Sequence, residues 1–177
     1  MFRLLLALMF GVSLVTGSAF AQSTDTSAET ETTSTTALVS SSWNLSCTPD
    51  SSTQELLCEA SQTIAFEETR QTLLIAFVTP WKQADAAEPF VLRFQLPHGL
   101  DIPAGLRIQI DDNPALSPVI QTSTQVGIYA RIGLSEPLLE SLKKGATMNV
   151  SFSAMNGNKL SVPVSLDGFS AIFAKLQ

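Results

Sequence analysis

The residues that could do chemistry in this sequence are few and lie far apart along the chain. The chain contains one histidine, His98, and two cysteines, Cys47 and Cys58. A hydrolytic triad needs a nucleophile, a base and an orienting group that meet in space, and His98 is the only imidazole that could serve as the base. His98 stands between Pro97 and Gly99, and these neighbours predict an exposed turn. An ordinary turn residue is therefore the simpler interpretation of His98.

Paired carboxylates are the other possible acid–base groups, because most glycoside hydrolases use two of them. Three pairs stand close together in the sequence: Glu67 and Glu68, Asp111 and Asp112, and Glu136 and Glu140. The segment Asp111-Asp112-Asn113-Pro114 also offers oxygen atoms to calcium, but it lacks the alternating ligands and the glycine of an EF-hand loop and has the composition of a turn. We therefore expect no catalytic residue, no metal site and no cofactor, with a cryptic envelope hydrolase as an alternative.

The two cysteines are predicted to form a structural disulfide. Trp43, Leu45 and Cys47 alternate with polar residues, and Cys58 lies in a second apolar run, Leu57–Ile64. A catalytic thiol or a zinc site is the competing interpretation, but the sequence has no CxxC spacing and too few histidines. An exported protein also meets an oxidising environment, in which such a bridge forms.

The N-terminal residues predict export. Arg3 precedes an apolar run over Leu4–Val15, and Ala19-Phe20-Ala21 places small residues two positions apart. This is the pattern of a secretory signal peptide over residues 1–21, with cleavage before Gln22. An uncleaved membrane anchor is the alternative, but the run is shorter than the roughly 20 residues of a bilayer span. We expect no transmembrane segment after signal cleavage.

Residues 22–42 predict a disordered linker. Serine and threonine dominate this segment, which also contains Asp25, Glu29 and Glu31 and no aromatic residue. Such a composition buries too little apolar surface to offset the entropy of ordering. An O-glycosylated stalk is the alternative. The net charge of the chain is −6 without a basic patch, which argues against nucleic acid or an anionic lipid surface as a partner.

The remaining segment, 43–177, predicts an all-β domain organised around Glu88–Asp112. Within this stretch the apolar residues Phe90, Leu92, Phe94 and Leu96 alternate with Val91, Arg93 and Gln95. Leu106–Ile110 alternates apolar with polar residues, and prolines and glycines separate the two runs. Alternation indicates strands with one buried face, and the intervening Pro and Gly residues indicate a turn. We therefore expect these two strands to form an antiparallel hairpin that needs a second layer to cover its apolar face.

Other elements follow from the same patterns. The run LLIAFV within Gln71–Thr79 indicates a central strand covered on both faces. A short helix is expected between Ser135, as N-cap, and Gly145, and a helical turn over Phe169–Leu176. Further strands are expected over Val119–Gln121, Val126–Ile132, Thr147–Ala154 and Lys159–Leu166. Together these elements predict an immunoglobulin-like β-sandwich of about 7–9 antiparallel strands with one short helix and a C-terminal helical turn. A closed barrel is the alternative.

The order of several motifs resembles the invasion-associated locus B family over about residues 43–177. The resemblance rests on Trp43, Cys47, Cys58, Gln62, Leu96–Leu100, Pro103–Leu106, Ile110-Asp111 and Pro163–Phe169. It implies a small exported protein of Gram-negative bacteria, in the periplasm or at the outer envelope, with an immunoglobulin-like sandwich and no established catalytic residue. The family's second cysteine pair is missing here, because Ser123 and Ile128 stand at those positions.

We therefore expect a non-catalytic binding or accessory domain whose partner is another envelope protein. A small-ligand carrier is a further alternative, which a lined internal cavity would favour. The sequence indicates neither the binding residues, nor the identity of the partner, nor the oligomeric state.

Overall fold

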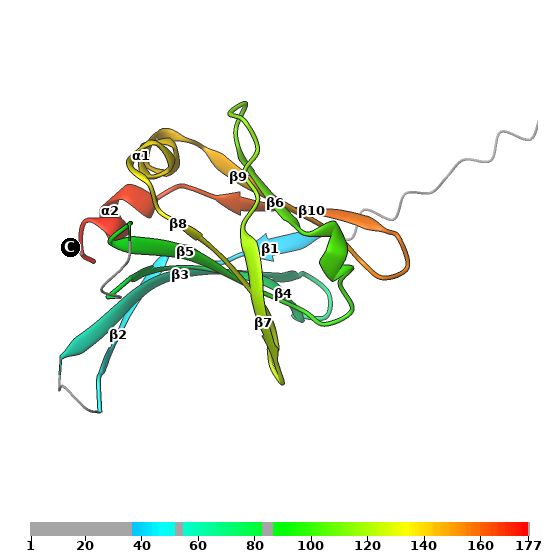
Figure 1. The fold of residues 1–177 in the computed structure, drawn as a ribbon, viewed down its shortest axis with the longest axis horizontal. Coiled ribbons are helices and arrows are strands. Elements are labelled where there is room, and N and C mark those ends of the chain that lie inside the picture. The colour runs from blue at the N-terminus through cyan, green and yellow to red at the C-terminus, as the bar shows by residue number, and fades with distance from the viewer. Residues whose placement is uncertain (1–36, 52–54, 83–86, 177) are drawn as a thin grey trace, which may run out of the picture. The chain divides into compact units, whose positions relative to one another are not determined.

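The computed structural model describes residues 37–51, 55–82 and 87–176, which form ten strands and two short α helices (Figure 1). The strands form two antiparallel sheets, one of seven strands and one of three. This arrangement confirms the predicted all-β sandwich architecture, although the number of strands exceeds the expected 7–9. The predicted signal peptide, 1–21, and most of the predicted linker lie outside the described residues.

The seven-stranded sheet has the order β1-β3-β4-β5-β8-β7, and β2 pairs with β3 next to β1. Its strands are β1 (Leu38–Ser40), β2 (Asn44–Pro49), β3 (Leu56–Phe66), β4 (Thr72–Pro80), β5 (Phe90–Leu96), β7 (Val119–Thr124) and β8 (Gly127–Gly133). Strand β3 therefore carries two short partners along one edge and the full length of β4 along the other. β4 is central, as its apolar run predicts.

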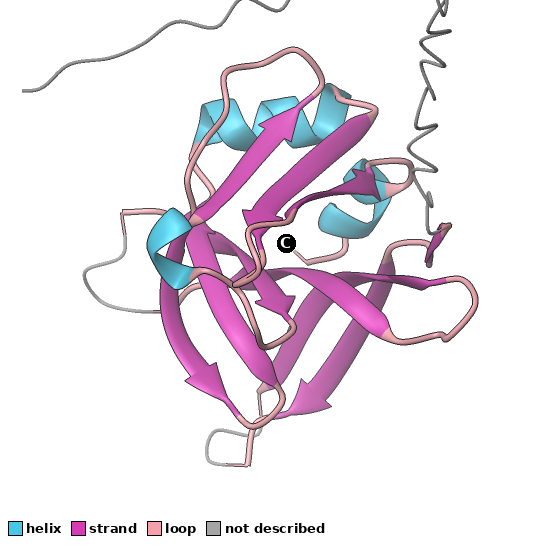
Figure 2. Ribbon diagram, turned by 90° about the vertical axis from the view of Figure 1, so that its right-hand side faces the viewer, coloured by secondary structure: helices cyan, strands magenta, loops and turns pink. Residues whose placement is uncertain are grey.

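The second sheet has the order β10-β9-β6, with β6 (Leu106–Ile110), β9 (Thr147–Ser153) and β10 (Lys159–Ser165). Helix α1 (Glu136–Lys144) connects β8 to β9, and α2 (Phe169–Phe173) follows β10. Figure 2 shows that the small sheet and these helices lie together on one side of the seven-stranded sheet. The edge position of β10, with Pro163 exposed, is the one predicted for this strand.

The core lies between the two sheets and follows from the alternation of each strand. Leu92, Phe94 and Leu96 of β5 are buried, as are Leu106, Ile108 and Ile110 of β6 and Met148, Val150 and Phe152 of β9. Trp43 joins this core to the C-terminal segment. Its indole Nε1 donates to the carbonyl of Ser165 at 2.8 Å, and its ring meets Phe169 edge-on with the centroids 5.1 Å apart.

Helix α1 forms where the capping pattern predicts it. Ser135 is the N-cap residue, although its hydroxyl makes no capping hydrogen bond, and the Gly145 amide closes the helix on the carbonyl of Ser141. Leu138 and Leu142 are buried among the core residues, so one face of the helix extends the core. The closing helix is also confirmed, with Phe169 and Phe173 buried.

The predicted hairpin between Phe90–Leu96 and Leu106–Ile110 is wrong. Both segments are strands, but β5 pairs with β4 and β8 in the large sheet, whereas β6 pairs with β9 in the small sheet. The connection instead passes from one layer to the other through a 3₁₀ turn, Ile102–Ala104. Alternation shows which face of a strand is buried, but it is silent about which strand lies beside it.

The predicted boundary at Trp43 also needs correction, because part of the predicted linker is ordered. Strand β1 lies within that segment and pairs with the end of β3, where Leu38 is in register with Phe66. Leu38 packs against the core. A short apolar pair at the end of a polar segment is sufficient for this contact when a neighbouring strand offers a free edge.

A second local correction concerns the predicted strand Val126–Ile132, whose alternation predicts that Val126 shares the buried face of Ile128. Val126 lies in the turn between β7 and β8 and is 68% exposed, and the strand begins at Gly127. A Cβ at Gly127 would stand 2.5 Å from the carbonyl oxygen of Leu96, and its φ is +153°. Only glycine allows so close an approach of the turn to β5.

Candidate functional site

No hydrogen bond or ion pair joins His98 to a candidate carboxylate in the described part of the chain. Its side chain is exposed, and its Nε2 lies 3.4 Å from the carbonyl oxygen of Gln125. The shallow pocket beside it is lined by amide, hydroxyl and apolar residues, including Gln71 and Gln95, and carries no carboxylate. His98 therefore lies in an exposed turn, as its neighbours predict.

Two of the three carboxylate pairs lie in turns at the ends of strands. Glu67 and Glu68 are exposed in the turn after β3. The carboxylate of Asp111 accepts hydrogen bonds from the amides of Ala146 and Thr147, both at 3.0 Å, and so anchors the start of β9 to the end of β6. Asp111 itself adopts a φ of +46°, which suits a turn. The predicted turn at this position is confirmed.

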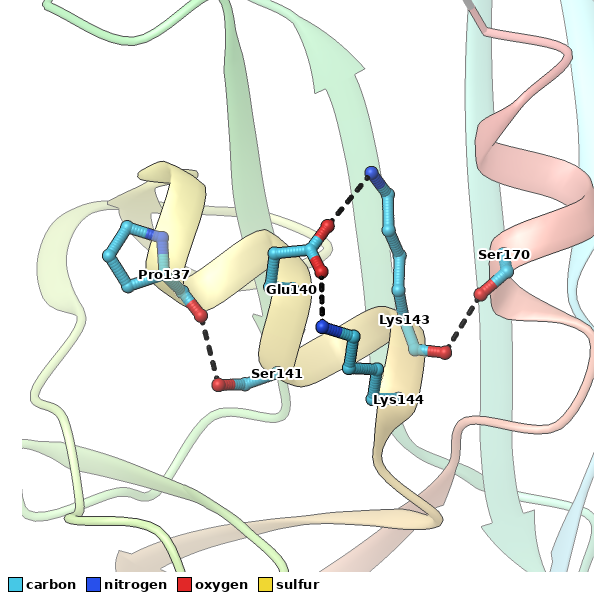
Figure 3. A network of polar contacts seen from close by, with 6 residues as sticks. All are labelled: Pro137, Glu140, Ser141, Lys143, Lys144 and Ser170. Carbon is cyan, nitrogen blue, oxygen red and sulfur yellow. Dashed lines mark hydrogen bonds and ion pairs between the residues drawn. The ribbon is translucent and has the colours of Figure 1, made fainter.

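The third pair lies on helix α1, where Glu140 is engaged by lysines (Figure 3). Its two carboxylate oxygens lie 2.7 Å from Nζ of Lys144 and 3.5 Å from Nζ of Lys143. The hydrogen bond and the charge of Lys144 lower the pKa of Glu140 below its ordinary value. The hydroxyl of Ser170 donates to the carbonyl of Lys143 at 2.9 Å and ties α2 to this helix. Glu140 thus belongs to a network that supports the end of the helix.

The disulfide prediction is confirmed. Cys47 and Cys58 face each other across β2 and β3 and are bridged, with their Cα atoms 4.0 Å apart. Among the described residues there is no free cysteine and no group of three metal-ligating side chains. Cys58 packs partly against the core, so the bridge fastens the outer hairpin of the large sheet to the interior.

A different surface gathers chemically distinctive side chains: the face of the seven-stranded sheet that points away from the small sheet, which we call the outer face. Neighbouring strands place Phe77, Arg93 and Arg131 side by side in register on this face. The next row along the strands places Ile75, Gln95 and Tyr129 together in the same way. Within the described part of the chain, no helix or further strand lies against this face (Figure 2).

Trp81, immediately after β4, completes the outer face. Its backbone amide donates to the carbonyl of Pro89 at 2.7 Å, so the residue has a defined position at the base of the β4–β5 connection. The guanidinium carbon of Arg131 lies 4.1 Å from the centroid of the Trp81 ring, which is a close cation–π contact. Arg93 contacts the Phe77 ring at 5.4 Å and forms a half-exposed ion pair with Glu59 at 3.3 Å.

Polar contacts order the other end of this face. The Tyr129 hydroxyl donates to Oε1 of Gln95 at 3.1 Å, and Nε2 of Gln95 donates to the carbonyl of Val126 at 3.2 Å. The outer face therefore combines fixed aromatic rings, guanidinium groups and amides. Aromatic residues and arginine are enriched where proteins bind one another, because they offer a large contact area, to which Trp, Tyr and Arg add hydrogen-bond donors.

A shallow pocket of about 380 Å³ opens on the outer face beside these residues. Leu57, Glu59, Trp81, Lys82 and Arg93 are among the residues that line it. Lys82 is paired with Glu55, and Leu57 is 45% exposed. The pocket is thus lined by apolar side chains and by charged side chains of both signs.

Sequence reasoning missed this surface. The apolar run LLIAFV predicts a strand covered on both faces, but Ile75 and Phe77 are only half-buried on the outer face. Val91, in the next strand, is buried but lies outside the main core cluster. The sequence did contain a signal, because Ile75 and Phe77 are apolar residues at outward positions of β4. The prediction that a second layer buries them was wrong.

A separate, mainly apolar pocket lies between α1 and β6. It measures about 250 Å³ and is lined mainly by apolar residues, among them Ile108, Leu116 and Leu138. Ser135 and Ser141 contribute hydroxyls to its wall.

Among the described residues, no helix has the length and apolar character needed to cross a membrane.

Comparisons with known proteins agree with the motifs and the fold. The family described as "Invasion associated locus B (IalB) protein" matches residues 43–177. Invasion protein B homologs from two strains of Brucella abortus are each 28% identical over 136 residues, which cover 76% of this chain and 75% of theirs. The crystal structure of invasion associated protein B from Bartonella henselae superposes with a TM-score of 0.63 at 18% identity, covering 76% of this chain and 89% of that one. The chain therefore belongs to the invasion associated locus B family.

Proposed function

We propose that this protein is exported to the bacterial envelope and acts there as a non-catalytic domain that binds another envelope protein through its outer face. The observation that carries the proposal is the row of Phe77, Arg93 and Arg131, half-exposed on a sheet face that no described element covers. A sheet face that serves only as a solvated surface normally carries small or charged residues, whereas this one presents rings and stacked guanidiniums.

The positions of the titratable groups support a binding role over catalysis. Asp111 and Glu140 hold structural contacts, and His98 faces a backbone carbonyl in a turn. No hydrogen bond or ion pair joins any two of these three side chains, whereas a nucleophile and its base are normally within hydrogen-bond reach. The names of the Brucella and Bartonella relatives connect them with invasion, and a binding domain at the bacterial envelope is compatible with that connection.

Site-specific photo-crosslinking in intact cells tests the proposal. A photoreactive phenylalanine analogue at Phe77 should yield a discrete adduct whose second component mass spectrometry identifies as an envelope protein. The same analogue at Lys159, exposed on the small sheet, is the matched control and should yield none. Equal adducts from both positions, or no adduct from Phe77, would contradict the proposal that the outer face is the binding surface.

Export is tested separately by the intact mass of the protein recovered from the periplasm. The mass should correspond to residues 22–177, with the bridge between Cys47 and Cys58 closed. Recovery in the cytoplasm with residues 1–21 attached would contradict the export part of the proposal and would leave the binding surface to be judged by the crosslinks.

A small-ligand carrier is the second candidate, and the apolar pocket between α1 and β6 is the observation that favours it. Native mass spectrometry of protein purified from the periplasm should then show an additional small mass. Leu138→Phe, which fills the pocket from the helix, should remove that mass. A pocket of this kind binds apolar molecules of modest size, because apolar side chains form most of its wall and Asn113, Ser135 and Ser141 supply its few polar groups.

A further inference from the structure

We propose that Arg131 and Arg93 form a carboxylate-binding site that receives an acidic side chain of the partner protein, with Trp81 and Phe77 contacting the apolar residues beside that side chain. This inference rests on the proposed function and deepens it, because it names the chemistry that the outer face recognises.

Arg131 has a fixed guanidinium without a polar partner. Its guanidinium stacks on Trp81, and within the described part of the chain it takes part in no ion pair and no side-chain hydrogen bond. Stacking on a ring occupies the flat face of the guanidinium and leaves its N–H groups free at the edge. A group held in this way is pre-organised for two parallel hydrogen bonds to a carboxylate, so little conformational freedom is lost on binding.

Arg93 lies directly opposite Arg131 on the neighbouring strand. Like charges at directly opposed positions destabilise a sheet, so this pair has a cost in the free protein. Glu59 offsets only part of it, because its ion pair with Arg93 is half-exposed and involves one guanidinium nitrogen. The Nε of Arg93 is buried without a hydrogen-bond partner. A carboxylate placed between the two guanidiniums would relieve their repulsion.

The surroundings favour a protein side chain over a lipid surface or nucleic acid. Glu59 pairs with Arg93, and Glu88 lies beside Gly133, two residues after Arg131, since a Cβ at Gly133 would stand 3.0 Å from the Cγ of Glu88. These two carboxylates, together with the net charge of −6, repel a continuous array of phosphates. A single carboxylate flanked by apolar residues fits two neighbouring arginines that each lie against an aromatic ring, Arg93 against Phe77 and Arg131 against Trp81.

The test uses the mature protein and a blocked tripeptide, acetyl-Phe-Glu-Phe-amide, as the probe. NMR detects the Nε–H signals of the arginines directly. At millimolar concentration the peptide should shift the Arg131 and Arg93 signals and change the fluorescence of Trp81, while buried Trp43 provides a constant background. The Gln analogue of the peptide should bind at least about tenfold more weakly, because it lacks the charge that makes these hydrogen bonds strong.

Variants separate the geometry of the site from its net charge. Arg131→Gln should weaken peptide binding about tenfold or more, and Arg131→Lys should restore little, because an ammonium group cannot form two parallel hydrogen bonds while stacked. Arg107→Gln, at an exposed position of the small sheet, removes the same charge elsewhere and should leave binding unchanged. Equal losses in Arg107→Gln and Arg131→Gln would mean that only net charge matters and would overturn the site.

Four further outcomes would overturn the inference. Equal shifts with inorganic phosphate would reveal a general anion site, and equal binding to phosphatidylglycerol vesicles would reveal a lipid site. A change at Arg131 on replacing Asp25, Glu29 and Glu31 by their amides would identify the chain's own acidic segment as the occupant. If the crosslink from Phe77 persists unchanged in Arg131→Gln and the tripeptide does not bind, the outer face is a docking surface but carboxylate recognition is wrong.

Discussion

Replacing Ile128 by alanine should destabilise this domain by about 2–5 kcal/mol, the range measured for large-to-small substitutions in protein cores. Ile128 is 3% exposed on the central strand β8 and faces Leu96 across the β5–β8 pair. The lost transfer free energy is about 2 kcal/mol, at roughly 0.8 kcal/mol for each buried carbon group removed. The residual cavity adds the rest, because β8 is held between two strands and has little room to collapse.

The position has particular interest because the family resemblance implies a cysteine there. Ser123 and Ile128 face each other in register across β7 and β8, which is the geometry a bridge between those strands would need. In this chain apolar packing of Ile128 takes the place of that covalent tie. A buried isoleucine contributes about 1.5–3 kcal/mol, which is comparable to a disulfide that closes a short loop.

Urea unfolding of the oxidised protein, followed by circular dichroism, measures the effect. Tyr129→Ala is the control, because Tyr129 is half-buried on the outer face and should cost less, about 1–2 kcal/mol. The slope of the unfolding free energy against urea should remain unchanged, since the same surface is exposed on unfolding. A cost for Ile128→Ala equal to or below that of Tyr129→Ala would refute the assignment of faces on β8.

Three further predictions concern the contacts that hold the domain together. Reduction of the Cys47–Cys58 bridge should remove about 3 kcal/mol and lower the Tm by roughly 10 °C while the β-rich circular dichroism spectrum remains; an unchanged Tm would contradict a stabilising role. Trp43→Phe should cost about 1–3 kcal/mol in denaturant unfolding, because the hydrogen bond of the indole is lost and a smaller ring leaves a gap; a neutral effect would show that the core closes around the change. Glu140 has its pKa lowered chiefly by Lys144, so its favourable contribution is complete above the ordinary value of 4.5 and is lost as the pH falls below it. Lys144→Ala should raise the pKa of Glu140 in an NMR titration, and no change would mean that the pair does not persist in solution.

Local periodicity determined most of the elements of this protein. The alternation of Ile128 and Tyr129 assigned opposite faces correctly, because successive side chains of a strand point in opposite directions whatever the strand pairs with. Helix α1 follows from its capping residues and from leucines at helical spacing, and these signals lie within one segment. The bridge between Cys47 and Cys58 was predictable because the chain offers only one possible pair.

Which strands pair with one another, and which side chains remain exposed, depended on contacts between segments that are distant in the sequence. The crossing from β5 to β6, the docking of β1 on β3 and the exposure of Phe77 on the outer face each depend on which edges and faces remain free after the sheets assemble. The local sequence pattern around an outward-facing apolar residue is the same whether or not a second layer of structure covers that residue.

The residues of the candidate site are likewise brought together by the pairing of strands that are distant in the sequence. Trp81 follows β4 and Arg131 lies in β8, and no periodicity links the two residues. Arg93 and Arg131 become opposed only because β5 and β8 are neighbours, although β6 and β7 intervene in the sequence. Side-chain alternation placed each arginine on an outward face, whereas strand order decided that the two guanidiniums meet beside an indole. Pairing between distant strands depends on the relative free energies of whole sheets, and a short stretch of sequence does not contain that information.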